Sequence, residues 1–154
     1  MKPATAWTLV TLQFVLITML VVIPQGTLWP TGLIAGVTAG VMLLGGLVLG
    51  VVSTITLGRA LTPNPIPRPD GHLETDGVYG LMRHPIYSAV LLAMVGVTVW
   101  GASTWHLVFF FLLVMLLSVK ARAEERLLIE RYEGYLDYAG RVGRFIPGVG
   151  TLKR

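Results

Sequence analysis

A polar and aromatic stretch, residues 77–87, interrupts a chain that is otherwise mostly apolar. It carries Tyr79, Arg83, His84 and Tyr87, whose side chains fall within less than about three helical turns of one another. These residues can line one cavity with cation-capable donors and aromatic faces. We therefore take this stretch as the centre of a candidate site.

A second charged cluster follows the last long apolar run and consists of Arg122, Glu124, Glu125 and Arg126. If the two apolar runs between the clusters form a helical hairpin, its end brings His84 near Glu124. Adjacent glutamates point about 100° apart on a helix, so at most one of them is expected to face a shared cavity squarely. The two clusters together predict a site with cation-capable donors, a carboxylate pair and aromatic faces.

Each of these charges also has a purely structural explanation. Arg83 and Arg122 could reach toward lipid phosphates. His84 could cap the helix that follows, and Glu124 and Glu125 could be a solvated helix end. The joint occurrence of both clusters at one membrane face favours a site. The chain shows no metal-ligand spacing and no phosphate or dinucleotide loop, so we expect no metal.

The composition indicates a single-domain integral membrane protein. Hydrophobic residues make up 54% of the 154 residues and charged residues 13%, whereas soluble domains carry about a quarter charged residues. The absence of Cys excludes disulfides, thiolate metal sites and Cys nucleophiles. The net charge of +4 fits basic cytoplasmic loops, so we infer no nucleic-acid partner.

Four apolar runs predict the helices, namely residues 7–23, 32–57, 86–101 and 105–119. The first is expected to end at Pro24, and Pro85 suits the first turn of the third. The last two are shorter than the roughly 20 residues of a straight span, and the fourth continues into charged sequence. The expected fold is all-α, with about four transmembrane helices: a hairpin over residues 1–57 and a core over residues 58–154.

Glycines recur at intervals of four in the second run, at Gly32, Gly36 and Gly40 and again at Gly46 and Gly50. Small residues at this spacing let a second helix approach closely in lipid. The sequence therefore predicts that this face of the helix packs against another helix.

A proline strap follows, in which Pro63, Pro65, Pro67 and Pro69 alternate with other residues. This pattern forces an extended, rigid path. The strap could lie across the site as a lid or serve as a plain connector, and the sequence does not favour one over the other.

The charged tail contains a stripe of apolar and aromatic residues, formed by Leu127, Leu128, Tyr132 and Tyr135. Such a stripe predicts a C-terminal cytoplasmic helix that lies along the membrane interface. We expect this helix to end at Gly140.

The positive charges predict the topology. All 12 Lys and Arg lie at Lys2, in residues 59–83 or in the tail from Lys120 onward. With four spans these segments face one side, and the positive-inside rule makes it the cytoplasm. The compact size suggests a prokaryotic inner membrane, with the active site facing the cytoplasm.

The motifs resemble the isoprenylcysteine carboxyl methyltransferase family, and related membrane phospholipid N-methyltransferases share much of the pattern. The resemblance covers roughly the C-terminal two thirds of the chain. It is carried by Gly77-x-Tyr79-x3-Arg83-His84-Pro85-x-Tyr87, a helical hairpin, Glu124-Glu125-x2-Leu128, Tyr132-x2-Tyr135-x2-Tyr138 and Arg144-Phe145-Ile146-Pro147.

This resemblance implies a membrane enzyme that uses S-adenosylmethionine and releases S-adenosylhomocysteine near the cytosolic surface. The acceptor would be an isoprenylcysteine-like carboxylate, a lipid or another small lipophilic acid, amine or thiol. By position, the implied cofactor contacts are Leu73, Gly77, Tyr79, His84, Pro85, Tyr87, Glu124 and Glu125. The implied catalytic residues are Arg83, Arg122, Glu125 and Arg144, one Arg orienting the acceptor.

Two alternatives remain open. Nicotinamide-dependent membrane lipid or sterol-type reductases resemble this chain in the His-Pro-x-Tyr element. They typically continue with a small residue and an acid, whereas Ser88 and Ala89 follow here. A non-catalytic membrane partner could also have kept the same shape. Cofactor binding separates the first alternative from a methyltransferase, and turnover separates the second.

Overall fold

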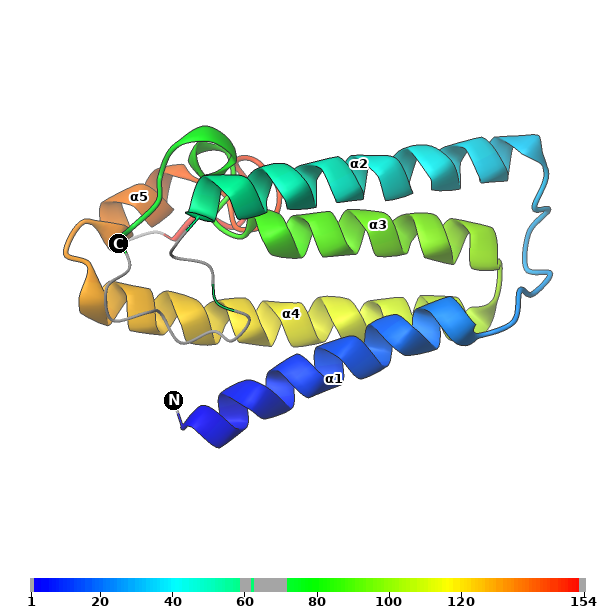
Figure 1. The fold of residues 1–154 in the computed structure, drawn as a ribbon, viewed down its shortest axis with the longest axis horizontal. Coiled ribbons are helices and arrows are strands. Elements are labelled where there is room, and N and C mark those ends of the chain that lie inside the picture. The colour runs from blue at the N-terminus through cyan, green and yellow to red at the C-terminus, as the bar shows by residue number, and fades with distance from the viewer. Residues whose placement is uncertain (1, 59–61, 63–71, 153–154) are drawn as a thin grey trace.

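The computed structural model of the chain describes residues 2–58, 62 and 72–152. The described residues form α-helices and one 3-10 helix, which confirms the expected all-α fold. In chain order the elements are α1 (Pro3–Val22), α2 (Leu33–Leu57), η2 (Gly77–Gly80), α3 (Pro85–Gly101), α4 (Thr104–Arg131) and α5 (Tyr135–Arg141). Figure 1 shows the long helices running in alternate directions, so that both termini, η2 and α5 gather at one end of the bundle. The proline strap lies outside the described residues.

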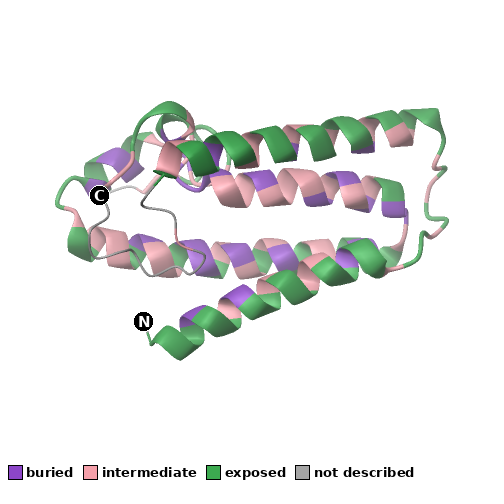
Figure 2. Cartoon of the chain, viewed as in Figure 1, coloured by how far each residue is buried: buried purple, intermediate pink, exposed green. Residues whose placement is uncertain are grey.

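Among the described helices, α1, α2 and α4 are long and apolar enough to cross a membrane. The 28 residues of α4 span about 42 Å, so its charged end extends well beyond a hydrocarbon core of about 30 Å. The 17 residues of α3 span only about 26 Å. Figure 2 shows that the outward faces of α1 and α2 are largely exposed, and the apolar side chains there suit contact with lipid tails.

Prolines set several helix boundaries, and the sequence predicted those at Pro24 and Pro85 but not the start of α1, which lies four residues before the expected run. α1 and α3 each begin with a proline, at Pro3 and Pro85, where a missing N–H costs no helical hydrogen bond. α1 ends at Val22 because Pro24 forces the preceding Ile23 into an extended conformation, with φ −62° and ψ 132°.

Small residues let α2 and α3 approach closely. A Cβ at Gly46 would stand 2.7 Å from the carbonyl oxygen of Ala89, and one at Gly96 would stand 2.7 Å from the backbone of α2. The predicted glycine packing is therefore confirmed at Gly46. It is wrong at Gly32 and Gly40, because among the described residues a Cβ there would meet nothing within 4 Å.

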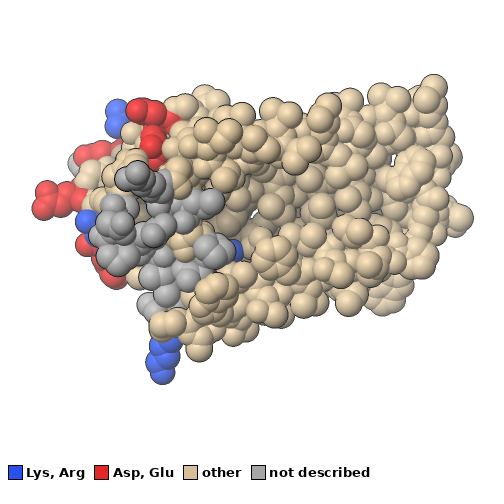
Figure 3. Space-filling model, viewed as in Figure 1, with Lys and Arg blue, Asp and Glu red and all other residues tan. Residues whose placement is uncertain are grey.

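The end of the bundle opposite the termini is uncharged, and side chains there donate hydrogen bonds to backbone carbonyl groups. Gln25 Nε2 donates to the carbonyl of Trp100 at 2.9 Å, and Trp29 Nε1 donates to that of Val99 at 2.8 Å. These bonds satisfy carbonyl groups that the end of α3 would otherwise leave without a hydrogen-bond partner. In Figure 3 the visible charged side chains gather at the other end.

The C-terminal helix differs from the prediction in its boundaries and its surroundings. α4 ends at Arg131, a turn follows, and α5 begins at Tyr135 and ends one residue beyond Gly140. Tyr135 is only 1% exposed and packs with Tyr138 inside the protein. Tyr135 therefore packs inside the protein and does not contribute to a surface stripe, and the placement of this segment along the membrane interface stays a prediction.

Candidate active site

The C-terminal segment holds the stretch that carries Arg83 and His84. The backbone N–H of Arg83 donates to the carbonyl of Gly143 at 2.8 Å, and that of His84 donates to the carbonyl of Arg144 at 3.0 Å. Pro85 then starts α3. Residues far apart in the sequence therefore fix the backbone on which the imidazole stands.

Glu125 lies at the centre of an ion cluster that we call the Glu125 cluster, formed with Arg83 and Arg144. Its Oε1 accepts from Nε and Nη2 of Arg83 at 2.9 and 2.8 Å, and its Oε2 accepts from Nη2 of Arg144 at 2.7 Å. Arg83 also donates to the carbonyls of Ala139 and Gly150, each at 3.0 Å. The cluster ties α4 to α5 and to the C-terminal segment, with the Glu125 side chain 4% exposed.

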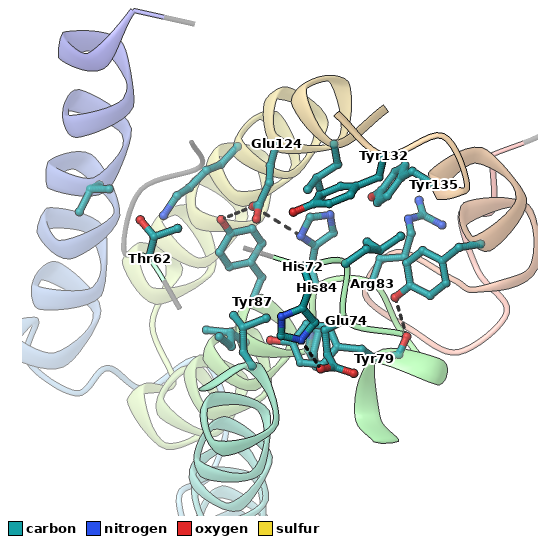
Figure 4. Close-up of a pocket in the computed structure, with 18 of the residues that line it drawn as sticks. Thr62, His72, Glu74, Tyr79, Arg83, His84, Tyr87, Glu124, Tyr132 and Tyr135 are labelled. Atoms are coloured by element: carbon teal, nitrogen blue, oxygen red, sulfur yellow. Dashed lines mark hydrogen bonds and ion pairs between the residues drawn. The ribbon is translucent and has the colours of Figure 1, made fainter. Parts of the chain in front are cut away.

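Glu124, the preceding residue, faces a cavity instead. Tyr87 donates its hydroxyl proton to Glu124 Oε2 at 2.9 Å, and His84 Nδ1 lies 3.7 Å from the same oxygen. The rings of His84 and Tyr87 stack with centroids 5.2 Å apart and planes 2° apart. His84 Nε2 lies 3.3 Å from Glu125 Oε1, so the imidazole joins the cavity wall to the Glu125 cluster. Figure 4 marks the contacts of Glu124 with dashed lines.

The cavity has a volume of about 230 Å³ and lies between α1 and the start of α5. Figure 4 shows Thr62 beside α1 on one side, with Tyr132 and Tyr135 on the other. His72 and Glu74, which hydrogen-bond to each other at 3.2 Å, also contribute to its wall. An apolar part of the lining comes from Val10, Phe14, Leu57 and Ile86.

Three tyrosines of the cavity wall differ in what their hydroxyl groups contact. Tyr138 donates to the carbonyl of Tyr79 at 2.6 Å, and Tyr79 donates to that of Ser53 at 3.4 Å. Burial raises the pKa of Tyr138 to about 12 and raises the pKa of Tyr79 and Tyr135 as well, so all three remain protonated. Within the described residues, the buried hydroxyl of Tyr135 has no hydrogen-bond partner. A buried polar group left alone costs about 1–3 kcal/mol, which indicates a place for a polar ligand atom.

Most residues predicted to hold a cofactor do line the cavity, namely Leu73, Tyr79, His84, Pro85, Tyr87 and Glu124. The cavity lining does not include Gly77 and Glu125. Gly77 has φ +55°, a left-handed conformation that favours glycine, so its presence is explained by the turn into η2. Among the predicted catalytic residues, Arg83 reaches the lining, Arg144 remains in the Glu125 cluster, and Arg122 is exposed on α4.

Sequence reasoning did not single out Lys120, Gln13 or Tyr135 as site residues, yet all three line the cavity. Lys120 was counted only as the start of the charged tail. Its position four residues before Glu124, at the end of an apolar run, was the signal that could have found it. Gln13 is the one amide side chain in the first apolar run.

Comparisons with known proteins identify the family. A model of the phospholipid methyltransferase family matches residues 34–134. Protein-S-isoprenylcysteine O-methyltransferase B of Arabidopsis thaliana is 33% identical over 112 residues, which cover 70% of this chain and 57% of that protein. Cobalt-zinc-cadmium resistance protein CzcN of Cupriavidus metallidurans is 33% identical over 107 residues, 66% of this chain and 48% of that protein.

The chain spans about half the length of the curated relatives it matches. The aligned segments nevertheless include most of the chain, and the family model covers more than half of it. The resemblance inferred from the motifs is thus confirmed, and the chain belongs to the phospholipid methyltransferase family.

Proposed function

We propose that this chain is a membrane-embedded methyltransferase that uses S-adenosylmethionine to methylate a lipophilic acceptor at the cytoplasmic face. The family match and the relatives named protein-S-isoprenylcysteine O-methyltransferase support this proposal. The observation that carries it is the convergence of Glu124, the stacked His84 and Tyr87 rings and the unpartnered Tyr135 hydroxyl on one cavity.

The side chains of this cavity fit the cofactor. S-adenosylmethionine supplies a methyl group bound to a sulfonium cation and also carries amino, carboxylate and sugar hydroxyl groups. The Glu124 carboxylate suits a cationic group of the cofactor, either its protonated amino group or its sulfonium. The Tyr135 hydroxyl can hydrogen-bond to a polar group that enters the cavity. S-adenosylhomocysteine, the product, keeps the protonated amino group and would use the same contacts except those to the sulfonium.

The chain contributes positioning and the exclusion of water. Tyr87 holds the Glu124 carboxylate in one orientation through its 2.9 Å hydrogen bond, and the stacked His84 ring limits the movement of Tyr87. The apolar lining at Val10 and Phe14 suits a lipophilic acceptor. Methyl transfer requires the acceptor atom, the methyl carbon and the leaving sulfur to lie in line. Holding both reactants in this arrangement removes a large part of the activation barrier.

We assign the Glu125 cluster a positioning role. Arg83 and Arg144 already donate to Glu125, and Arg83 also donates to backbone carbonyls, so these groups hold the cavity wall in place. We leave Arg122 out of the machinery because it is exposed and outside the cavity lining. The charges gathered at the site's end of the bundle support a cytoplasmic active site through the positive-inside rule.

Calorimetric titration of the protein in nanodiscs tests the proposal, with S-adenosylhomocysteine and NADPH as separate ligands. We expect saturable binding of S-adenosylhomocysteine that weakens in His84→Ala, since this change removes the imidazole between Glu124 and Glu125. Arg126→Gln, an exposed change on α4, serves as the matched control and should bind like the wild type. Absence of S-adenosylhomocysteine binding to the wild type would contradict the proposal. Binding of NADPH instead would indicate the reductase alternative, which no observation favours at present.

A further inference from the structure

Lys120 is a buried cation in a helix long and apolar enough to cross a membrane. It is 2% exposed, and its Nζ donates to Gln13 Oε1 of α1 at 2.7 Å. The same ammonium group lies 5.1 Å from the ring centroid of Tyr87. Charged residues inside membrane spans are costly and rare, and they usually mark a ligand pathway. The position of Lys120 therefore calls for a functional explanation.

Lys120 and Glu124 form a polar pair of opposite charge along one face of α4. They are four residues apart, which places Lys120 about 6 Å further along the helix toward its apolar part. Tyr87 contacts both, because its hydroxyl bonds Glu124 while its ring faces Lys120. Both charged residues line the same cavity. A ligand group next to Lys120 therefore lies adjacent to the position we assign to the methyl donor.

The surroundings of Lys120 suit an apolar chain. Val10 and Phe14 of α1 line the cavity together with Leu57 and Ile86. Phe14 is also 60% exposed, so the cavity wall is continuous with the outer apolar surface of α1. An acceptor with a long apolar tail could thus place its tail along α1 and its polar head beside the ammonium group.

We propose that Lys120, positioned by Gln13 and Tyr87, receives the anionic head of a lipophilic acid acceptor and selects against amines. This inference rests on the proposed methyltransferase function. A carboxylate would gain a charge-assisted hydrogen bond, whereas a protonated amine would meet a like charge where water is scarce. Methylation of a carboxylate forms an O–C bond as the S–C bond breaks. The sulfur keeps the electron pair, and the products are a neutral ester and a neutral thioether. No proton has to be removed, so an acid acceptor requires no general base.

Three probes with the same apolar chain test this assignment: dodecanoate, dodecanol and dodecylamine. Their binding to the protein in nanodiscs is measured with S-adenosylhomocysteine present, and binding to empty nanodiscs is subtracted. We expect the wild type to bind dodecanoate about tenfold or more tightly than dodecanol, and dodecylamine most weakly. Lys120→Met, which shortens the side chain by one atom and removes a buried charge, should abolish the preference for the acid. Lys120→Arg should restore part of it, and Arg126→Gln should keep it.

Affinity for S-adenosylhomocysteine in Lys120→Met separates this inference from the proposed function. We expect that affinity to change less than about threefold, and retained binding would also show that the variant is folded. If Lys120 were only a structural tie between α1 and α4, its replacement would not change the preference among head groups. The inference is overturned if the wild type binds the amine as well as the acid, if it binds no probe, or if Lys120→Met keeps the preference. Failure of the wild type to bind S-adenosylhomocysteine, with the head-group preference intact, would overturn the methyltransferase proposal and the role of the acid as methyl acceptor, and would leave only the selection of an acid head by Lys120.

Discussion

Glu124 and Glu125 are neighbours on one helix with opposite surroundings. The Glu125 side chain is 4% exposed and accepts hydrogen bonds from two guanidinium groups, whereas that of Glu124 is 26% exposed and faces a cavity. One step along a helix rotates the side chain by about 100°, which is enough to place one carboxylate in the Glu125 cluster and its neighbour in the cavity lining. A run of charged residues in a motif therefore need not contact one ligand together.

The two regions should respond differently to mutation. Groups in the Glu125 cluster are desolvated and paired, so removing one leaves buried charges and costs stability. Groups in the cavity wall have room for a ligand, so removing one should reduce binding while the fold persists. The predictions below use this contrast in order of decreasing effect.

The largest effect is expected for Glu125→Ala. The change leaves Arg83 and Arg144 without their carboxylate, and breaking a buried ion pair in this way costs about 3–5 kcal/mol. We expect a marked fall in the thermal unfolding midpoint and in the yield of folded protein from detergent. If this variant is as stable as the wild type but no longer binds S-adenosylhomocysteine, then Glu125 is a ligand contact and the contrast fails.

Glu124→Gln should weaken binding of S-adenosylhomocysteine by about tenfold to about a hundredfold, because a charged hydrogen bond contributes about 1.5–3 kcal/mol. Its effect on stability should stay within about 1 kcal/mol, since the amide oxygen can still accept from Tyr87. Titration calorimetry and thermal unfolding of the same preparation measure both quantities. A loss of stability as large as that of Glu125→Ala would show that Glu124 belongs to the scaffold.

Two tyrosine changes sharpen the contrast within one small helix. Tyr138→Phe removes the donor to the carbonyl of Tyr79 and should lower the free energy of unfolding by about 1 kcal/mol. Tyr135→Phe removes a buried hydroxyl without a described partner, so the free energy of unfolding should stay the same or rise slightly. Binding of S-adenosylhomocysteine should nevertheless weaken by about threefold to about tenfold. Loss of stability without loss of binding in Tyr135→Phe would remove this residue from the site.

The smallest effect is expected for Arg122→Gln. Arg122 is exposed on α4 and outside the cavity lining, so the free energy of unfolding should change by less than about 0.5 kcal/mol. The dissociation constant for S-adenosylhomocysteine should stay at the wild-type value. Weaker binding in this variant would place Arg122 back among the residues of the site, as the sequence alone suggested.

Much of the fold could be predicted from the sequence because its signals are local. Pro24 and Pro85 mark a helix end and a helix start, and the long apolar run before Leu57 matches α2 closely. The break between α4 and α5 was not predicted, because it depends on Tyr135 packing into the protein, which propensities along the chain do not encode.

The sequence predicted the location of the candidate site, but not which side chains face the cavity. The approach of His84 to both glutamates follows from the helical hairpin. Which glutamate faces the cavity depends on the rotation of α4 about its axis, and a pattern of charges does not determine it. The burial of Lys120 depends on Gln13, 107 positions away in the chain, so no local pattern reveals their contact.

A structure determined with S-adenosylhomocysteine bound is the most direct test of the division between cavity and scaffold. We expect the ligand to lie between His84 and Tyr135, with Glu124 in contact and the Glu125 carboxylate still held by Arg83 and Arg144. Ligand bound directly to Glu125, with those guanidinium groups displaced, or ligand outside this cavity, would contradict it.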